Sequence, residues 1–343
     1  MHRPPSTLPD SIPASRSARK AAHARHFSAR RAPSQMAPQS LKAFLAYAGN
    51  LFAQLPASLN EIPNPFSVGL EPAGRSGQCY IPLSGAPACP IDGPLSCHNS
   101  TPIAGDCCFI HPGGRMLLTQ FWDDQVHAGG AEEDWTLHGL WPDLCDGGYD
   151  QFCNLVPQYK NISAILKAQG QSELVEFMDR YWLSNRGSNE GLWEHEWNKH
   201  GTCINTLAAS CYSPAAASGA VAATANPGEL AVVDYFTRAV ALFKSLDTFT
   251  ALQKAGITPS SRTHYPLVDV QAALERHVGG GKVVLRCAGG RRGTILREAW
   301  YHFFVQGSLQ SGEFVPAKDP PSHDAGNCAP WVRYMPKRGR REL

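Results

Sequence analysis

Eleven cysteines constrain the fold of this chain more than any other feature, because ten of them lie between Cys89 and Cys328. No Cys-x-x-Cys spacing of the kind that binds zinc occurs anywhere in the sequence. Disulfide frameworks persist in oxidising compartments. We therefore expect a disulfide-rich domain that folds in such a compartment, and the cysteine count alone leaves the connectivity open.

Hydrophobic periodicity predicts both strands and helices. Apolar and β-branched runs predict strands at 116–122, 136–141, 282–287 and 299–306. Helical spacing of apolar residues predicts helices at 162–169, 172–182, 229–246 and 266–278. The Ala/Ser-rich segment 207–225 is interpreted as a surface loop. Helices and strands in separate groups indicate an α+β fold, with an antiparallel central sheet and helices packed on it.

The two ends of the chain differ in composition from its body. Residues 1–35 hold seven Lys/Arg against one acid, Asp10, and are interpreted as a disordered or targeting extension or a mis-assigned start. A mitochondrial transit peptide is the competing interpretation. Residues 36–58 are interpreted as a signal peptide and residues 335–343 as a basic tail. No apolar run approaches 18 residues, so we expect no membrane span.

The body of the protein is weakly acidic once the basic leader is set aside. Residues 36–343 contain 24 Lys/Arg and 28 Asp/Glu, a formal charge of −4. A polybasic surface that binds nucleic acid by counterion release would have the opposite sign. Any contact with nucleic acid must therefore be made at a local site.

The segment 194–203 (EHEWNKHGTC) concentrates ionisable side chains. On a helix at about 100° per residue, His195, Lys199, Glu196 and His200 fall at roughly 0°, 40°, 100° and 140°. Groups this close perturb one another's pKa values, as in active sites. A solvated amphipathic face is the alternative interpretation, but such faces seldom carry two histidines between tryptophans.

A metal site is the second alternative for this segment. Zinc proteases place two histidines at i and i+4 on one helix face. Here His195 and His200 are separated by i, i+5, so their imidazoles should diverge by roughly 140° on an ideal helix. Lys199 also adds a cation where the metal would lie. We therefore expect no metal.

A second segment, 135–143 (WTLHGLWPD), carries another histidine, His138, on a predicted strand. Together the two segments resemble the paired active-site segments of the ribonuclease T2 family of secreted acid ribonucleases, in its fungal branch. The resemblance covers residues 79–334, which we take as the ribonuclease domain. It implies the disulfides Cys89–Cys108, Cys97–Cys145, Cys107–Cys211, Cys153–Cys203 and Cys287–Cys328. Cys79 would then be left over.

The resemblance implies a secreted endoribonuclease that cleaves single-stranded RNA to 2′,3′-cyclic phosphates and then 3′-phosphates, with low base specificity and no cofactor. Such cleavage needs a base for the 2′-OH, an acid for the leaving 5′-oxygen and stabilisation of the anionic phosphorane. His200 is expected as the base and His138 as the acid, with the reverse assignment open. Lys199 is expected to stabilise charge, Glu196 to orient an imidazole, and His195 to bind phosphate.

Substrate-binding residues also follow from the resemblance. Trp141 and Tyr149 are expected to sandwich a base, with Asp143 accepting a hydrogen bond from an exocyclic amine. The site for the downstream base is expected at Gln120, Ser184 and Asn185. Departures from the fungal pattern at this second site occur at Leu183, Arg186 and Leu192, and Leu192 lacks an aromatic ring to stack on a base.

The remaining expectations concern setting and partners. Asn99 and Asn161 lie in Asn-x-Ser/Thr sequences and are expected to be glycosylated in a secreted or vacuolar product. We expect a monomer that acts on RNA and does not cleave DNA. The alternative from another functional class is a non-catalytic secreted RNA-binding or signalling protein on the same scaffold. The complete set of ionisable residues in the two segments favours the enzyme.

Overall fold

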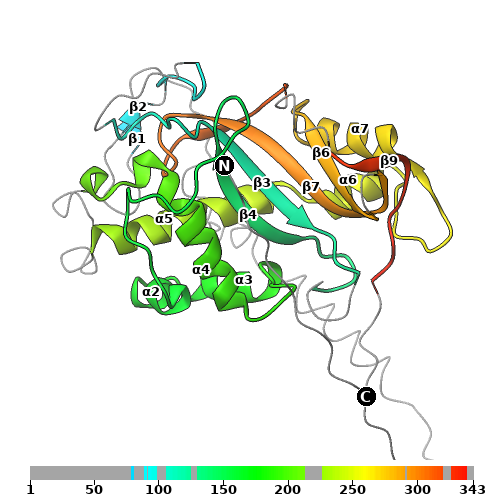
Figure 1. Ribbon diagram of the computed structural model, residues 1–343, viewed down its shortest axis with the longest axis horizontal. Coiled ribbons are helices and arrows are strands. Elements are labelled where there is room, and N and C mark those ends of the chain that lie inside the picture. Colours follow the sequence, from blue (N-terminus) through cyan, green and yellow to red (C-terminus); the bar gives the residue numbers. More distant parts are fainter. Residues whose placement is uncertain are drawn as a thin grey trace, which may run out of the picture. The chain divides into compact units, whose positions relative to one another are not determined.

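Strand β7 (Gly293–Gln306) is the centre of the sheet, because four other strands pair with it. The computed structural model of the protein describes residues 79–80, 89–90, 92–98, 106–124, 130–212, 226–289, 292–319 and 326–337 (Figure 1). All of them belong to one compact unit, Asn64–Leu343. The expected leader (1–35), signal peptide (36–58) and Asn99 lie outside the described residues.

The main sheet has seven strands in the order β4-β3-β7-β9-β5, with β6 and β8 also paired to β7. Its strands are β3 (Arg115–Phe121), β4 (Thr136–Asp143), β5 (Tyr265–Pro266), β6 (Val283–Ala288), β8 (Glu313–Pro316) and β9 (Cys328–Arg333). A small separate sheet pairs β1 (Cys79–Tyr80) with β2 (Cys89–Pro90). The predicted α+β fold with an antiparallel sheet is confirmed, except that β7 and β9 run parallel.

The helices fall into two groups beside this sheet (Figure 1). Helices α2 to α5 gather near β3 and β4, whereas α6 and α7 lie near β9 and β6. Their bounds are α2 (Ile162–Ala168), α3 (Ser172–Tyr181), α4 (Asn189–Lys199), α5 (Pro227–Ser245), α6 (Thr248–Lys254) and α7 (Leu267–His277). Helix α5 begins earlier than its apolar stripe, because Asn226 caps it and Pro227 occupies its first turn.

Buried indole and phenol groups connect the helices to strand β4. The N–H of Trp182, after α3, donates to the carbonyl of His138 on β4 at 2.7 Å. Trp193 on α4 donates in turn to the carbonyl of Trp182 at 3.0 Å, and the Tyr235 hydroxyl on α5 donates to the Leu140 carbonyl at 2.9 Å. A buried N–H or O–H needs such a partner. These bonds fix α3, α4 and α5 against β4.

Five disulfides join the pairs that the family resemblance implies: Cys89–Cys108, Cys97–Cys145, Cys107–Cys211, Cys153–Cys203 and Cys287–Cys328. Cys107–Cys211 closes the longest loop, with a sequence separation of 104. Cys153–Cys203 ties the loop after β4 to the short 3₁₀ turn η2 (Gly201–Cys203) that follows α4. The side chain of Cys79 lies outside the described residues.

Two sequence interpretations need correction. The segment 207–225 does not start as a surface loop, because Leu207 and Cys211 are buried in 3₁₀ turns; residues 213–225 lie outside the description. The basic tail also begins as ordered chain. Trp122 donates to the Met335 carbonyl at 2.7 Å, and the Lys337 ammonium lies 4.4 Å from the Trp122 ring centroid.

Replacing Cys153 and Cys203 together by serine should lower the free energy of unfolding by about 2–4 kcal/mol, because the bridge closes a long loop. Amide hydrogen exchange at Phe152, whose N–H donates to the Lys199 carbonyl at 3.0 Å, should become faster. Denaturant unfolding and exchange measurements test both effects. As a control, replacing Cys287 and Cys328 should reduce stability without this local change; equal protection at Phe152 in both variants contradicts the prediction.

Candidate active site

Strand β4 and the end of helix α4 bring the two histidine segments together. The Ser188 hydroxyl caps α4 by accepting from the Gly191 N–H at 3.1 Å. The helix ends at Lys199, and His200 occupies its C-cap with φ −111° and ψ −52°. Gly201 follows, where a Cβ would lie 2.6 Å from the Trp197 ring. The close packing of Trp197 therefore sets the point at which His200 leaves the helix.

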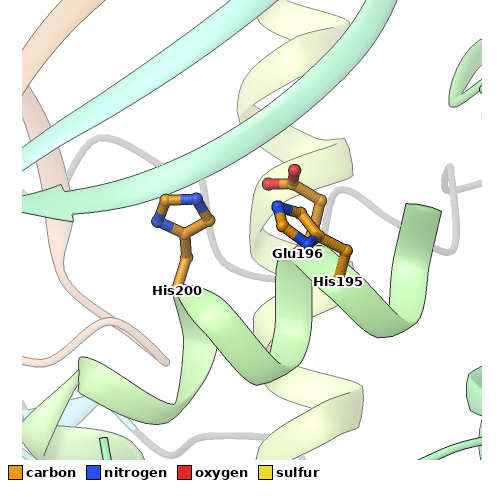
Figure 2. A group of neighbouring side chains, drawn as sticks. All are labelled: His195, Glu196 and His200. Atoms are coloured by element: carbon orange, nitrogen blue, oxygen red, sulfur yellow. The ribbon is translucent and has the colours of Figure 1, made fainter. Parts of the chain in front are cut away.

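The ionisable residues of α4 differ sharply in exposure. Glu196 is fully buried and His200 is nearly so, whereas His195 is exposed. Figure 2 shows the three side chains on one side of the helix, with the Glu196 carboxyl group next to the His195 ring and the His200 ring facing them. The prediction that the imidazoles diverge is wrong: their ring centroids lie 6.4 Å apart. The angle of 140° expected between the two side chains does not apply, because α4 ends at Lys199 and His200 lies outside the regular helix.

Glu196 is the buried centre of this cluster. Its Oε2 accepts a hydrogen bond from the Trp141 indole N–H at 2.8 Å, and its Oε1 lies 3.9 Å from His138 Nε2. Gly139 leaves the space that this contact occupies. A Cβ at Gly139 would lie 1.9 Å from Glu196 Oε2 and 2.5 Å from Trp141 Nε1.

Burial dominates the protonation of the cluster. It raises the pKa of Glu196 to about 8, against the opposing effects of the Trp141 hydrogen bond and of Lys199. Burial, with nearby His195 and Lys199, lowers the pKa of His138 to about 3. Burial, with nearby Lys199, His195 and His138, lowers the pKa of His200 to about 2. In the free protein the carboxyl group is therefore the preferred proton carrier near neutral pH.

Aromatic rings pack against both imidazoles, of which His200 is buried and His138 is partly exposed. Trp141 stacks on His200, with centroids 5.0 Å apart at 16°, and meets His138 edge-on at 4.9 Å. Phe121 of β3 stacks on the ring of His138 at 4.1 Å and 19°. Sequence reasoning missed Phe121, although the alternation of side chains along a strand predicts that it and its neighbour Gln120 point to opposite faces.

Gln120 itself is not at the site, and this sequence prediction is wrong. Its side chain is fully buried, its amide donates to the Leu246 carbonyl at 3.1 Å, and its carbonyl accepts from Thr248 at 2.7 Å. These partners lie at the end of α5 and the start of α6, on the face opposite Phe121. The family resemblance implied Gln120 for this position, but its side chain lies on the other face of the strand.

The other expected base-binding residues lie on β4 and on segments next to it. Asp143 and Tyr149 pair through a backbone bridge, and the Tyr149 side chain is exposed. The Lys199 ammonium lies 6.0 Å from the Tyr149 ring centroid. Ser184 and Asn185 lie in the loop that starts at Trp182, the residue bonded to the His138 carbonyl. Trp141 stacks on His200 and makes no described ring contact with Tyr149.

Three residues could hold a metal ion by geometry. Ligand atoms of His195, Glu196 and His200 lie within 4.8 Å of one another. The argument against zinc from their sequence spacing therefore fails. The nearby Lys199 ammonium still disfavours a bound cation by charge repulsion, and the raised pKa of Glu196 disfavours the deprotonated carboxylate that a metal needs as a ligand.

Two imidazoles, a carboxyl group and an ammonium around one point form the arrangement of a general acid–base enzyme. The Ribonuclease T2 family matches residues 113–315. Ribonuclease T2 of Aspergillus oryzae is 43% identical over 74% of this chain and 85% of its own length, and Ribonuclease Trv of Hypocrea rufa is 44% identical over 73% and 98%. The crystal structure of Actibind, a T2 ribonuclease, is 40% identical with a TM-score of 0.64, over 74% of this chain and 99% of that one. The chain belongs to the Ribonuclease T2 family.

A Glu196→Gln variant should change the pH dependence of stability. A carboxyl group whose pKa is higher in the folded state than in the unfolded chain takes up a proton on folding, so its contribution falls as pH rises from 4.5 to about 8. His138 and His200 act in the opposite sense, but only below their ordinary pKa of 6.5. Between pH 6.5 and 8 the melting temperature should therefore fall less in the variant than in the wild type. Glu194→Gln on the same helix is the control, and equal slopes in all three proteins would refute the assignment.

A Gly139→Ala variant should break the contact between Glu196 and Trp141, because the added methyl group has no space. Overpacking of this kind typically costs about 1–3 kcal/mol of stability, and RNA cleavage should fall more steeply than stability. Gly148→Ala is the matched control, because a Cβ there would meet its nearest neighbour at 3.3 Å. Thermal unfolding and cleavage assays test both variants; full activity in Gly139→Ala would show that the contact is dispensable.

Proposed function

We propose that this ribonuclease is an endonuclease that cleaves single-stranded RNA by transesterification to a 2′,3′-cyclic phosphate, followed by hydrolysis to a 3′-phosphate. The observation that supports this most directly is the placement of two imidazoles, His138 on β4 and His200 at the end of α4, against the same Trp141 ring. Two proton-transferring groups on separate elements can act on opposite sides of one phosphate. The reaction needs no cofactor.

The burial of the site supports separate roles for these histidines. Their lowered pKa values leave both imidazoles neutral in the free protein, and a neutral imidazole is the form that accepts a proton. We assign His200 as the base that deprotonates the 2′-OH and His138 as the acid, with the reverse assignment compatible with the geometry. The acid must gain its proton before the reaction, and the neighbouring Glu196 carboxyl, 3.9 Å away, is the nearest source.

The remaining polar residues suit the charge of the reaction. Lys199 stabilises the negative charge that develops on the phosphorane. His195, which is exposed at the rim, binds the phosphate. Glu196, which accepts a hydrogen bond from the Trp141 indole and lies beside His138, stores a proton and releases it to that imidazole. A phosphate anion entering the site raises the pKa of each imidazole, because opposite charges favour the protonated form.

Base binding belongs to the aromatic and polar residues around this centre. Tyr149 offers an exposed ring, and Asp143 an acceptor for an exocyclic amine, which favours adenine. Ser184 and Asn185 bind the downstream nucleotide, together with Phe121, which stacks on His138, in place of Gln120. Aromatic stacking tolerates any base, so overall base specificity is low.

The setting follows from the disulfides. Five bridges suit a secreted or vacuolar protein, and the exposed Asn161 is available for glycosylation. None of the described helices is long and apolar enough to span a bilayer. We propose that the protein acts as a monomer on RNA and does not cleave DNA. A non-catalytic RNA-binding role is the alternative, and the complete acid–base cluster disfavours it.

Purified protein should convert an oligoribonucleotide to 2′,3′-cyclic phosphates before 3′-phosphates, in the presence of EDTA. His138→Ala and His200→Ala should each lower kcat by about 10²–10⁴-fold, because acid and base act in one transition state. His195→Ala should raise KM more than it lowers kcat. His264→Ala is the control and should keep full activity, because His264 precedes β5, at the other end of the strand order from β4.

The product and the substrate analogue decide the mechanism. DNA and 2′-O-methyl RNA lack the nucleophile and should remain intact. A 5′-phosphate product, a metal requirement or cleavage of DNA would rule the transesterification out. Binding of RNA without any cleavage would favour the non-catalytic alternative.

A further inference from the structure

The structure assigns a further nucleotide subsite next to the catalytic cluster, in which the guanidinium of Arg286, seated on Trp300, binds a phosphate of the RNA chain beyond the scissile bond. This inference rests on the proposed function, because it requires a polymeric RNA substrate. The site lies on β6 and β7, outside both histidine segments. It extends the active site along the face of the sheet.

The position of this subsite follows from strand register. Trp300 of β7 lies opposite Thr119 of β3, and Thr119 lies opposite Gly139 of β4. One strand further, Arg286 of β6 pairs with Glu298 of β7, which pairs with Phe121. Since side chains alternate along a strand, these residues share the sheet face on which Phe121 meets His138.

A chain of ring contacts connects the subsite to the catalytic residues. Trp141 stacks on His200 at 5.0 Å, and the Trp300 ring meets Trp141 edge-on at 5.7 Å. The Arg286 guanidinium carbon lies 4.6 Å from the Trp300 ring centroid. The subsite is therefore separated from the catalytic histidine by two tryptophans, a spacing that suits a neighbouring nucleotide of the same strand.

Arg286 is prepared to bind an anion. Its guanidinium rests against an aromatic face, which orients the planar donor group and limits its rotamers. Among the described residues Arg286 forms no ion pair within 4.0 Å. Arg297 on the neighbouring strand β7, in contrast, pairs with Asp124. A partly buried arginine with unused donors and a fixed plane is suited to phosphate.

Glu298 is the carboxyl group that lies across the strand pair from Arg286 and contacts Trp300. Its Oε2 accepts the Trp300 indole N–H at 2.5 Å, and burial raises the pKa of Glu298 while Arg286 and this bond act against the shift. The carboxylate thus fixes the indole that supports Arg286. The body of the protein carries a formal charge of −4, so a single oriented arginine beside the site changes the local potential for RNA.

The test compares a substrate that reaches the subsite with one that does not. Arg286→Ala should lower kcat/KM for an adenylate hexanucleotide about fivefold or more relative to kcat/KM for the dinucleotide ApA. The loss of one phosphate contact should also reduce the slope of log(kcat/KM) against log[salt] for the hexanucleotide by about 0.7. Arg286→Lys should retain the salt slope, and Trp300→Ala should reproduce the loss of hexanucleotide preference, because Arg286 loses its support.

Arg262→Ala is the matched control for net charge. Arg262 is exposed and precedes β5, the strand at the sheet edge opposite β4, so both substrates and the salt slope should match the wild type. An equal loss on both substrates in Arg286→Ala, or no loss on either, overturns the subsite while the proposed function stands.

A binding measurement separates the two proposals. Fluorescence anisotropy with a labelled deoxyadenylate hexanucleotide, which has no 2′-OH, reports binding without cleavage. Arg286→Ala should weaken this binding about fivefold and reduce its salt slope in the same way. If the wild type cleaves no RNA, the proposed function fails, and the salt slope of binding still decides the subsite.

Discussion

The active site depends on one buried contact, the hydrogen bond from the Trp141 indole to the Glu196 carboxyl group. A carboxyl group removed from water is costly unless it is hydrogen-bonded or neutral, and here it is both bonded and shifted towards the neutral form. The contact needs the space at Gly139, a Trp two residues further on, and an acid on the facing helix. The sequence His-Gly-Leu-Trp of β4 is therefore a packing requirement as much as a set of chemical groups.

The scaffold holds this contact from several directions. Trp182 bonds the backbone of His138, Tyr235 bonds the backbone of Leu140, and Cys153–Cys203 fixes the turn after His200. None of these groups touches the reacting atoms. Each restrains the backbone beside a residue of the cluster, which is the support that a preorganised site requires.

Sequence reasoning reached the fold class and the location of the cluster, because these are encoded by residue type and spacing, whereas the disulfide pairs followed from the family resemblance. It failed where the outcome depends on one residue of register. Gln120 and Phe121 are neighbours on β3, and only the pleat decides that the phenylalanine faces His138 while the glutamine bonds α5 and α6. His200 is a similar case, because the position of its imidazole depends on where α4 ends.

Tertiary contacts explain the other differences. Strand β7 begins at Gly293, earlier than its apolar run suggests, because β6 and β9 supply partners for its first residues. Residues of the expected tail, Met335 and Lys337, are ordered by Trp122. A periodic pattern along one segment does not contain the partner that stabilises it.

The protonation of the site links its burial to its chemistry. In the free protein burial keeps both imidazoles neutral and the Glu196 carboxyl group protonated near neutral pH. Lys199 is then the cation of the cluster. Acid–base catalysis needs that proton on an imidazole. An anionic phosphate favours the transfer, because it stabilises an imidazolium in the same low-dielectric surroundings that destabilise it in the free protein. The substrate would thus complete the charge balance of the site, and the cluster would reach its reactive protonation state only when RNA is bound.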